Sequence, residues 1–294
     1  MPRPSRFALV AAFAAVYLIW GSTYLAIDRG VAEIPPFFMA CVRFLAGGAV
    51  FVAWAAHRGA ARPTARDWAA TALIGLLMAA GGNGLVSWAL LRLPSGMGAL
   101  LVGMVPLWVA LADWLRPRGA RPPARVIAGL VLGFAGVALL VNPAEFAGAR
   151  GIDPVGAGTI VVASLLWAAG SVYSRYAPQP SSQALSSGMQ MLGGAAVLGC
   201  MSLASGELAG HDWRAVSATA FGAWAYVAVL GSVAYGSYLW LLKASTPAKA
   251  ATYAYVNPVI ALVLGYFVAN EVLSPWSMGC SALVLVAVLL VVSR

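Results

Sequence analysis

The sequence predicts an all-α integral membrane protein of ten transmembrane helices, arranged as two inverted five-helix repeats. Three observations predict this class. Of the 294 residues, 62% are hydrophobic and only 9% are charged, whereas a soluble domain has roughly 25% charged residues. Apolar runs of about 20 residues, enough to cross a hydrocarbon core of roughly 30 Å, recur along the whole chain. Short patterns of the first half also recur in the second half.

The apolar runs define ten expected spans, which follow one another so closely that no soluble domain fits between them. The first run has full length and no small-residue cleavage site follows it, so we expect an anchor rather than a cleaved signal peptide. The expected spans are residues 7–27, 35–56, 68–91, 95–115, 124–141, 154–175, 183–204, 217–242, 247–269 and 275–292.

The distribution of basic residues predicts that both chain ends are cytoplasmic. If the N-terminus is inside, only four of the 18 basic residues, Arg29, Arg92, Arg150 and Arg214, lie in outside loops. This excess on one side is the positive-inside pattern of membrane proteins. The net charge of +9 is dispersed over short loops between apolar spans, so we expect no nucleic-acid binding.

An internal repeat is visible in two pairs of segments. The segment around Trp20 reads YLIWGS and the segment around Trp167 reads SLLWAA, at an offset of 147 residues. The segment that ends at Pro106 reads LLRLPSGMGALLVGMVP, and the segment that ends at Pro258 reads LLKASTPAKAATYAYVNP. Ordered matches at a nearly constant offset indicate a duplicated unit.

The duplication has a consequence for orientation. We expect one five-helix repeat over residues 7–141 and a second over residues 154–292. Because each unit has an odd number of spans, the second unit enters the membrane from the opposite side. Inverted repeats permit alternating access to a central site, so the pattern favours transport.

The same residues resemble a known family. The matching features are the WGS of Trp20, Gly21 and Ser22, then Pro36 and Arg43-Phe44, the prolines Pro106 and Pro258, and Glu271 after the ninth span. In this order, the chain resembles the drug/metabolite transporter superfamily, specifically its EamA-type exporters, over essentially its whole length. In one departure, the first copy has Arg116 to Gly119 where the second has Glu271.

The resemblance implies a function. Within the superfamily the chain looks most like bacterial exporters of amino acids and related metabolites. This implies a multi-pass inner-membrane protein that exports aromatic and other neutral amino acids, or related metabolites, by alternating access through a central cavity.

Polar and aromatic side chains at helical spacing mark the expected cavity, because lipid offers them no partners. The alternatives are the interfacial aromatic belt for Trp and Tyr, and a cytoplasmic position for Lys249 with its charge in water. The cavity candidates are Trp20 and Tyr24 in the first span, Asn83, Ser87 and Trp88 in the third, Trp167 and Ser171 in the sixth, Tyr235 and Tyr238 in the eighth, and Lys249, Tyr253 and Asn257 in the ninth.

Two prolines and one charge inside the spans complete the candidate site. Pro106 and Pro258 leave the carbonyls of Val102 and Ala254 without helical donors, which predicts kinks that serve as hinges or, alternatively, only in packing. Arg43 is the only charge clearly inside a span. Such a charge faces protein or water, so it either attracts a substrate carboxylate or organises neighbouring helix ends.

Motifs of other protein classes are missing from the sequence. No Asp or Glu lies deep in an expected span, and there is no GxxxxGKS, HExxH or GxSxG motif. Cys41, Cys200 and Cys280 are odd in number and fall in apolar spans, which argues against a disulfide framework or a zinc site. We therefore expect no catalytic residue, metal or cofactor, and movement down a gradient rather than ATP-driven transport.

Alternatives from other classes stay open at this point. An exporter of amphipathic drugs or other small metabolites and a passive channel for small solutes both suit a polar centre lined by small residues. The expected partners are a small-molecule substrate and the lipid bilayer. The oligomeric state is left open, and a monomer is compatible with the sequence.

Overall fold

The computed structural model describes residues 5–93, 95–117, 119–140, 153–269 and 275–292, apart from some side chains, including that of Tyr24. In these ranges the chain is all-helical and contains no strand. Glu271 lies outside the described residues.

The helices follow the expected spans closely. The first half contains α1 (Arg6–Val31), α2 (Pro36–His57), α3 (Ala65–Gly75), the π-helix η1 (Leu76–Gly84), α4 (Leu85–Ala89), α5 (Ser95–Val102), α6 (Val105–Leu115) and α7 (Ala124–Leu140). The second half contains α9 (Pro154–Tyr176), α10 (Gln183–Ser205), α11 (Ala218–Ala244), α12 (Pro247–Ala251), α13 (Tyr253–Ala269) and α14 (Pro275–Val292).

The outside of the bundle is suited to lipid. Within the described residues, six helices are long and apolar enough to cross a membrane: α1, α2, the continuous stretch α3–η1–α4, α9, α10 and α11. Shorter apolar helices cover Leu100–Leu115, Ala124–Leu139 and Met278–Val292. Large apolar side chains such as Phe7 and Leu115 are 83% and 71% exposed on the bundle surface. Apolar surface of this extent is rare on soluble monomers and typical of membrane contact.

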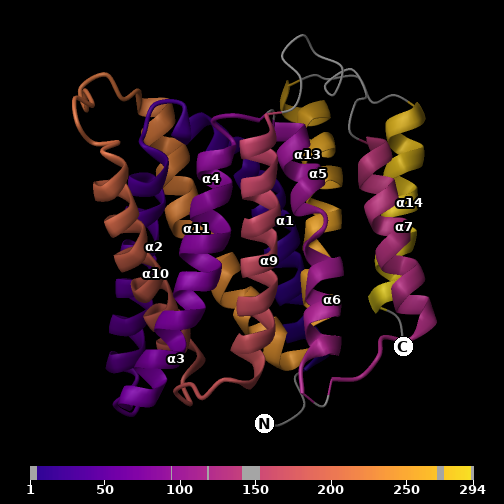
Figure 1. Ribbon diagram of the computed structural model, residues 1–294, viewed down its shortest axis with the longest axis horizontal. Helices are drawn as coiled ribbons and strands as arrows, with labels where there is room; N and C mark the ends of the chain where they lie inside the picture. Colours follow the sequence, from indigo (N-terminus) through magenta and orange to yellow (C-terminus); the bar gives the residue numbers. More distant parts are fainter. Residues whose placement is uncertain (1–4, 94, 118, 141–152, 270–274, 293–294) are drawn as a thin grey trace.

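The two halves of the chain are packed into each other. Helix α2 packs against α10, and α1 packs against α11, while α7 and α14 pair at one edge of the bundle (Figure 1). Successive spans cross the bundle in alternating directions, so that α1 and α9 run oppositely (Figure 1). A Cβ on Gly75 of α3 would lie 2.1 Å from the carbonyl oxygen of Gln190 on α10, so this crossing requires glycine.

Two carboxylates connect the first and second halves of the chain by hydrogen bonds at one end of the bundle. Glu33, in the α1–α2 turn, accepts hydrogen bonds from the amide (2.6 Å) and the hydroxyl (2.9 Å) of Ser217 at the start of α11. Glu207, after α10, accepts from the amides of Phe38 (2.6 Å) and Phe37 (3.3 Å) at the start of α2. Glu33 therefore caps the start of α11, and Glu207 caps the start of α2. Both carboxylates satisfy amides that lack partners within their own helix.

Asp153 caps the start of α9 at the same end of the bundle. Its carboxylate accepts from the amides of Gly156 (2.9 Å) and Val155 (2.8 Å), and forms an ion pair with Arg92 at 3.3 Å. The hydrogen bond from Gly156, followed by those from Val155 and Arg92, holds the pKa of the Asp153 carboxyl below its ordinary value.

The fourth and ninth spans are both interrupted. Helix α5 ends at Val102 and α6 begins at Val105, with Pro106 in its first turn, where a missing amide costs little. The ninth span is interrupted at Thr252, whereas α13 continues through Pro258. The Thr252 hydroxyl donates to the Lys249 carbonyl (2.7 Å) and so competes with the helical amides. The sequence predicts a kink at Pro258, which lies inside α13, and it does not predict the interruption at Thr252.

The third span contains a π-helix that the sequence did not predict. It covers Leu76–Gly84 and includes three glycines and Asn83. A π-helix has about one more residue in each turn than an α-helix. The side chain of Asn83 therefore points in a different direction from the one it would have in a regular α-helix.

Candidate functional site

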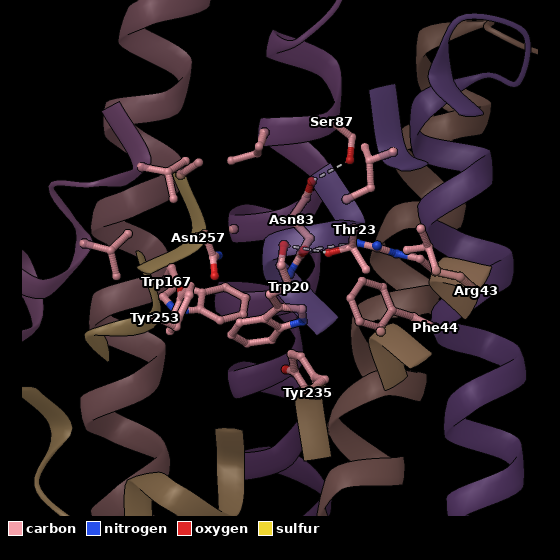
Figure 2. A pocket seen from close by; sticks show the side chains of 18 of the residues that line it. Trp20, Thr23, Arg43, Phe44, Asn83, Ser87, Trp167, Tyr235, Tyr253 and Asn257 are labelled. Carbon is pink, nitrogen blue, oxygen red and sulfur yellow. Dashed lines mark hydrogen bonds between the residues drawn. The ribbon is translucent and has the colours of Figure 1, made fainter. Parts of the chain in front are cut away.

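A cavity lies inside the bundle and takes its lining from both halves of the chain (Figure 2). Its walls come from α1, α2, η1, α4, α9, α11 and α13, with Val102 of α5 and Val105 of α6 beside the interrupted fourth span. Its volume of about 80 Å³ has room for a few water molecules in this conformation.

Most of the candidate residues meet at this cavity. Seven of them, together with the intramembrane arginine, form part of the lining: Trp20, Arg43, Asn83, Ser87, Trp167, Tyr235, Tyr253 and Asn257. These side chains come from six different spans, so the helical stripes expected from the sequence converge on one site.

Other candidates lie elsewhere. The Lys249 ammonium donates to the carbonyl of Val292 at the end of α14 (2.6 Å), because the interruption at Thr252 separates it from the face of Tyr253. Trp88 is half-buried beneath the Arg92 guanidinium, 4.6 Å from its ring centroid. Ser171 and Tyr238 lie next to the cavity without being part of its lining, and the side chain of Tyr24 is outside the described residues.

Two polar residues of the lining were not predicted. Thr23 and Ser164 both line the cavity and are 3% and 2% exposed. Each is three positions from a candidate tryptophan, Thr23 after Trp20 and Ser164 before Trp167, and therefore lies on the same helical face. This spacing was a usable signal.

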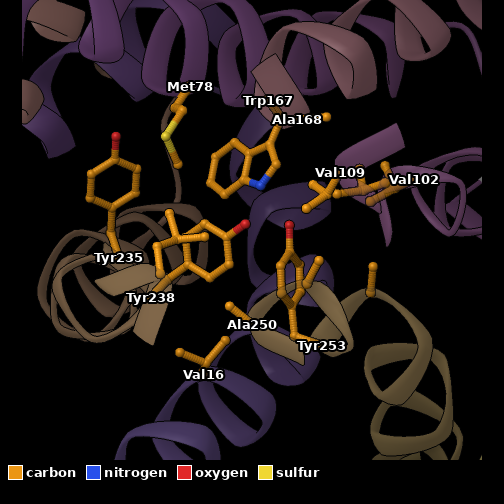
Figure 3. Packing of buried hydrophobic residues seen from close by; sticks show 14 of the residues in the cluster. Val16, Met78, Val102, Val109, Trp167, Ala168, Tyr235, Tyr238, Ala250 and Tyr253 are labelled. Carbon is orange, nitrogen blue, oxygen red and sulfur yellow. The ribbon is translucent and has the colours of Figure 1, made fainter. Parts of the chain in front are cut away.

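Four aromatic rings border the cavity on one side and form what we call the aromatic layer. It consists of Trp20 of α1, Trp167 of α9, Tyr238 of α11 and Tyr253 of α13. All six pairs of these rings are in contact, with centroid distances between 4.5 and 6.5 Å. Figure 3 shows Tyr238 and Tyr253 directed toward Trp167. Edge and tilted contacts of this kind are the favourable geometries for aromatic pairs.

Polar groups beyond the aromatic layer are mostly paired with protein, and we call this region the packed side. Tyr17 and Thr252 share a hydrogen bond of 2.6 Å, and the hydroxyls of Ser171 and Tyr238 share one of 2.9 Å. The Arg175 guanidinium donates to the carbonyls of Leu242 and Ser245 at the end of α11.

The cavity side of the layer differs from the packed side, because several buried polar atoms there have no hydrogen-bond partner among the described residues. They are Arg43 Nε, Ser164 Oγ, Trp167 Nε1, Tyr235 Oη and both amide atoms of Asn257, and all six belong to residues of the lining. A buried polar atom without a partner costs about 1–3 kcal/mol, so most such groups in proteins are satisfied. Half of the twelve such atoms among the described residues surround this one cavity, which indicates a place for a polar solute.

A lipid-facing helical bundle with a polar cavity at its centre defines a multi-pass membrane protein that handles a small solute. Comparison with known proteins gives the particular family. The sequence model of the EamA-like transporter family matches residues 6–142 and, separately, residues 154–293. The chain belongs to the EamA-like transporter family, within the drug/metabolite transporter superfamily.

Individual relatives cover nearly the whole chain. It is 37% identical over 285 residues to the uncharacterized inner membrane transporter YedA of Escherichia coli (strain K12), covering 96% of this chain and 90% of YedA. It is 28% identical to a chloroplastic WAT1-related protein of Arabidopsis thaliana, covering 94% of this chain and 67% of that protein. A crystal structure with 21% sequence identity superposes with a TM-score of 0.76 and 98% coverage of both chains, which supports the fold.

Proposed function

We propose that this protein is an inner-membrane exporter of amino acids, aromatic and other neutral ones, or of related metabolites. In this proposal the solute occupies the central cavity, which opens alternately to the two sides of the membrane. The observation that carries it is the cavity itself, where unpaired buried polar atoms from both halves face one space beside a closed aromatic layer. The name of YedA supports the inner membrane as its location.

We further propose that the two halves, residues 7–141 and 154–292, are inverted repeats of five spans each. Two separate matches to one family model support this, as do the opposite directions of α1 and α9 (Figure 1). The interruptions at the fourth span and at Thr252 of the ninth are also consistent with a repeat. Interrupted helices at corresponding positions of two repeats are typical of the substrate sites of transporters.

In the proposed topology both chain ends are cytoplasmic, as the basic residues of the loops predict. The cavity lining of α1 then lies in the C-terminal half of that helix, toward the outside. The aromatic layer separates it from the cytoplasm, so this conformation corresponds to an outward-facing or occluded carrier. A closed layer of this kind favours a carrier over a passive channel.

The proposal is tested with purified protein in liposomes, by counterflow of radiolabelled L-phenylalanine. We expect saturable counterflow that unlabelled neutral amino acids inhibit. A channel would instead give flux that rises linearly with concentration and no counterflow. Because the described residues of the cavity lining include no Asp or Glu, we expect counterflow without a pH gradient. Strict proton dependence would contradict exchange without a gradient.

Variants of the lining connect transport to this cavity. Replacing Trp20, Trp167 or Tyr253 by alanine should change phenylalanine export while leaving membrane insertion intact, because each ring borders the cavity. Trp54→Ala is the matched control, since Trp54 is 54% exposed on the outside of α2. Unchanged export in all three lining variants would remove them from the transport route.

A further inference from the structure

We propose that Arg43 binds a carboxylate of the transported solute, so that the cavity selects small monocarboxylates, amino acids included, over amines and amides of the same shape. This inference rests on the proposed function and names the chemical group that the site recognises. Its basis is a buried arginine that the protein leaves electrostatically unpaired in the wall of the cavity.

Arg43 is buried, with 6% of its surface exposed, and it lines the cavity. Within the described parts of the chain the recorded ion pairs are Arg92–Asp153 and Arg116–Asp113, and neither involves Arg43. The described residues of the lining include no Asp or Glu. A guanidinium stays charged in proteins, and burying a charge without a counter-charge is costly. The site therefore favours an anion from outside the chain.

The donors of Arg43 are only partly used. Its Nη2 donates to Asn83 Oδ1 at 3.0 Å, its Nε has no protein partner, and its guanidinium lies 4.6 Å from the ring centroid of Phe44. A guanidinium has five N–H donors in a flat fork that matches the two oxygens of a carboxylate. Asn83 is a neutral acceptor, so its hydrogen bond orients Arg43 without cancelling the charge.

Asn83 is itself held in place by the π-helix. Its Nδ2 donates to the Met78 carbonyl (3.4 Å), and its own carbonyl accepts from Ser87 Oγ (2.9 Å). With Nδ2 directed at a carbonyl, Oδ1 is left to face Arg43. Single π-helical turns occur frequently at functional sites because they re-aim side chains. We assign Asn83 as a positioning residue for the Arg43 guanidinium.

The opposite wall suits the rest of a neutral amino acid. Asn257, which is 3% exposed, presents an amide with neither atom paired to protein. In Figure 2 Asn257 and Arg43 lie on opposite sides of the cavity, with Trp20 between them and Trp167 beside Asn257. An amide oxygen and aromatic faces can accept an ammonium group, while the rings cover an apolar side chain.

Arg175 shows what a purely structural arginine looks like in this fold. Its guanidinium donates to two carbonyls at the end of α11, where helical carbonyls lack partners. Arg43 is the eighth residue of α2, far from either helix end, so organising a helix terminus does not explain it.

The test compares three competitors of phenylalanine counterflow in liposomes: unlabelled L-phenylalanine, L-phenylalaninamide and phenethylamine. The last two retain the ring and the amine but lack the carboxylate. In the wild type we expect phenylalanine to compete roughly 10- to 100-fold better than either, the range expected for a hydrogen-bonded charge. Equal competition would overturn the inference while leaving the proposed export intact. A wild type without any counterflow would overturn the proposed function itself.

Variants of Arg43 and Asn83 test which residue produces the preference for a carboxylate. Arg43→Gln should abolish the difference between the three competitors, Arg43→Lys should retain part of it, and Asn83→Ala should reduce it with the charge still present. Arg29→Gln, which removes an exposed charge at the end of α1, is the control. A folded Arg43→Gln variant that keeps the full preference would contradict the assignment. If that variant fails to fold, the ranking in the wild type and in Arg43→Lys decides.

Discussion

Polar groups on the two sides of the aromatic layer differ in their hydrogen bonding to the protein. On the packed side, Tyr17, Ser171 and Arg175 are all hydrogen-bonded to other residues of the chain. Exceptions outside the cavity lining include Ser174 Oγ, Gln190 Oε1 and Trp108 Nε1. On the cavity side, buried polar atoms of lining residues such as Arg43 and Asn257 have no protein partner. The first set of groups stabilises the bundle, whereas the second set is the one that our proposal assigns to the solute.

The largest expected effect comes from opening the layer between the two regions. Trp167→Ala removes a 6% exposed indole that contacts the other three rings of the layer, so we expect a loss of about 3–5 kcal/mol in the free energy of unfolding. Thermal unfolding in detergent measures it, with Trp54→Ala as the exposed control. If Trp167→Ala and Trp54→Ala lowered the free energy of unfolding equally, packing within the aromatic layer would not stabilise the protein.

The buried Arg43 and the half-buried Arg175 give the next contrast. Arg175→Ala should lower the free energy of unfolding by about 1–3 kcal/mol, because it removes charge-assisted hydrogen bonds to the end of α11. Arg43→Met should cost less than about 1 kcal/mol, since replacing an uncompensated buried charge by an apolar side chain is often neutral. Yet Arg43→Met should lose the preference for phenylalanine over phenethylamine in counterflow. The reverse order of stabilities would break the distinction between the two sides.

Two serines of α9 provide the smallest and best-matched contrast. Ser171→Ala deletes the partner of the Tyr238 hydroxyl and should cost about 0.5–1.5 kcal/mol. Ser164→Ala deletes a hydroxyl that has no protein partner and should leave the stability of the empty protein nearly unchanged. Equal losses in thermal unfolding would show that pairing does not distinguish the two sides.

The helical spans were predictable because composition alone defines them. An apolar run long enough to cross the membrane must form a helix there, since no other local structure satisfies its backbone. The predicted first and last residues agree with α2, α9 and α10 to within a residue or two. The convergence of Trp20, Trp167 and Tyr253 followed from placing polar and aromatic stripes on helical faces.

Local interruptions of the helices were not predictable in the same way. Proline predicts a kink, but a hydroxyl that competes for backbone hydrogen bonds interrupts a helix without any proline, as the Thr252 hydroxyl does before α13. Because this interruption lies between Lys249 and Tyr253, Lys249 does not share the cavity-facing side of α13. The π-helix around Asn83 has no periodic signal in the sequence. The position of the aromatic layer along each helix depends on ring contacts between distant spans. The sequence therefore could not show that Ser164 lies on the cavity side of the layer and Ser171 on the packed side.

The most direct test of the account is thiol labelling on the two sides of the layer. Ser164→Cys and Ser171→Cys are placed separately in a variant without the three native cysteines, and a membrane-impermeant thiol reagent is applied from one face at a time. We predict that the outer face labels position 164 and leaves position 171 unlabelled, until Trp167→Ala opens the layer. Equal labelling of both positions from the same face in the presence of Trp167 would contradict a central cavity closed by these aromatic rings.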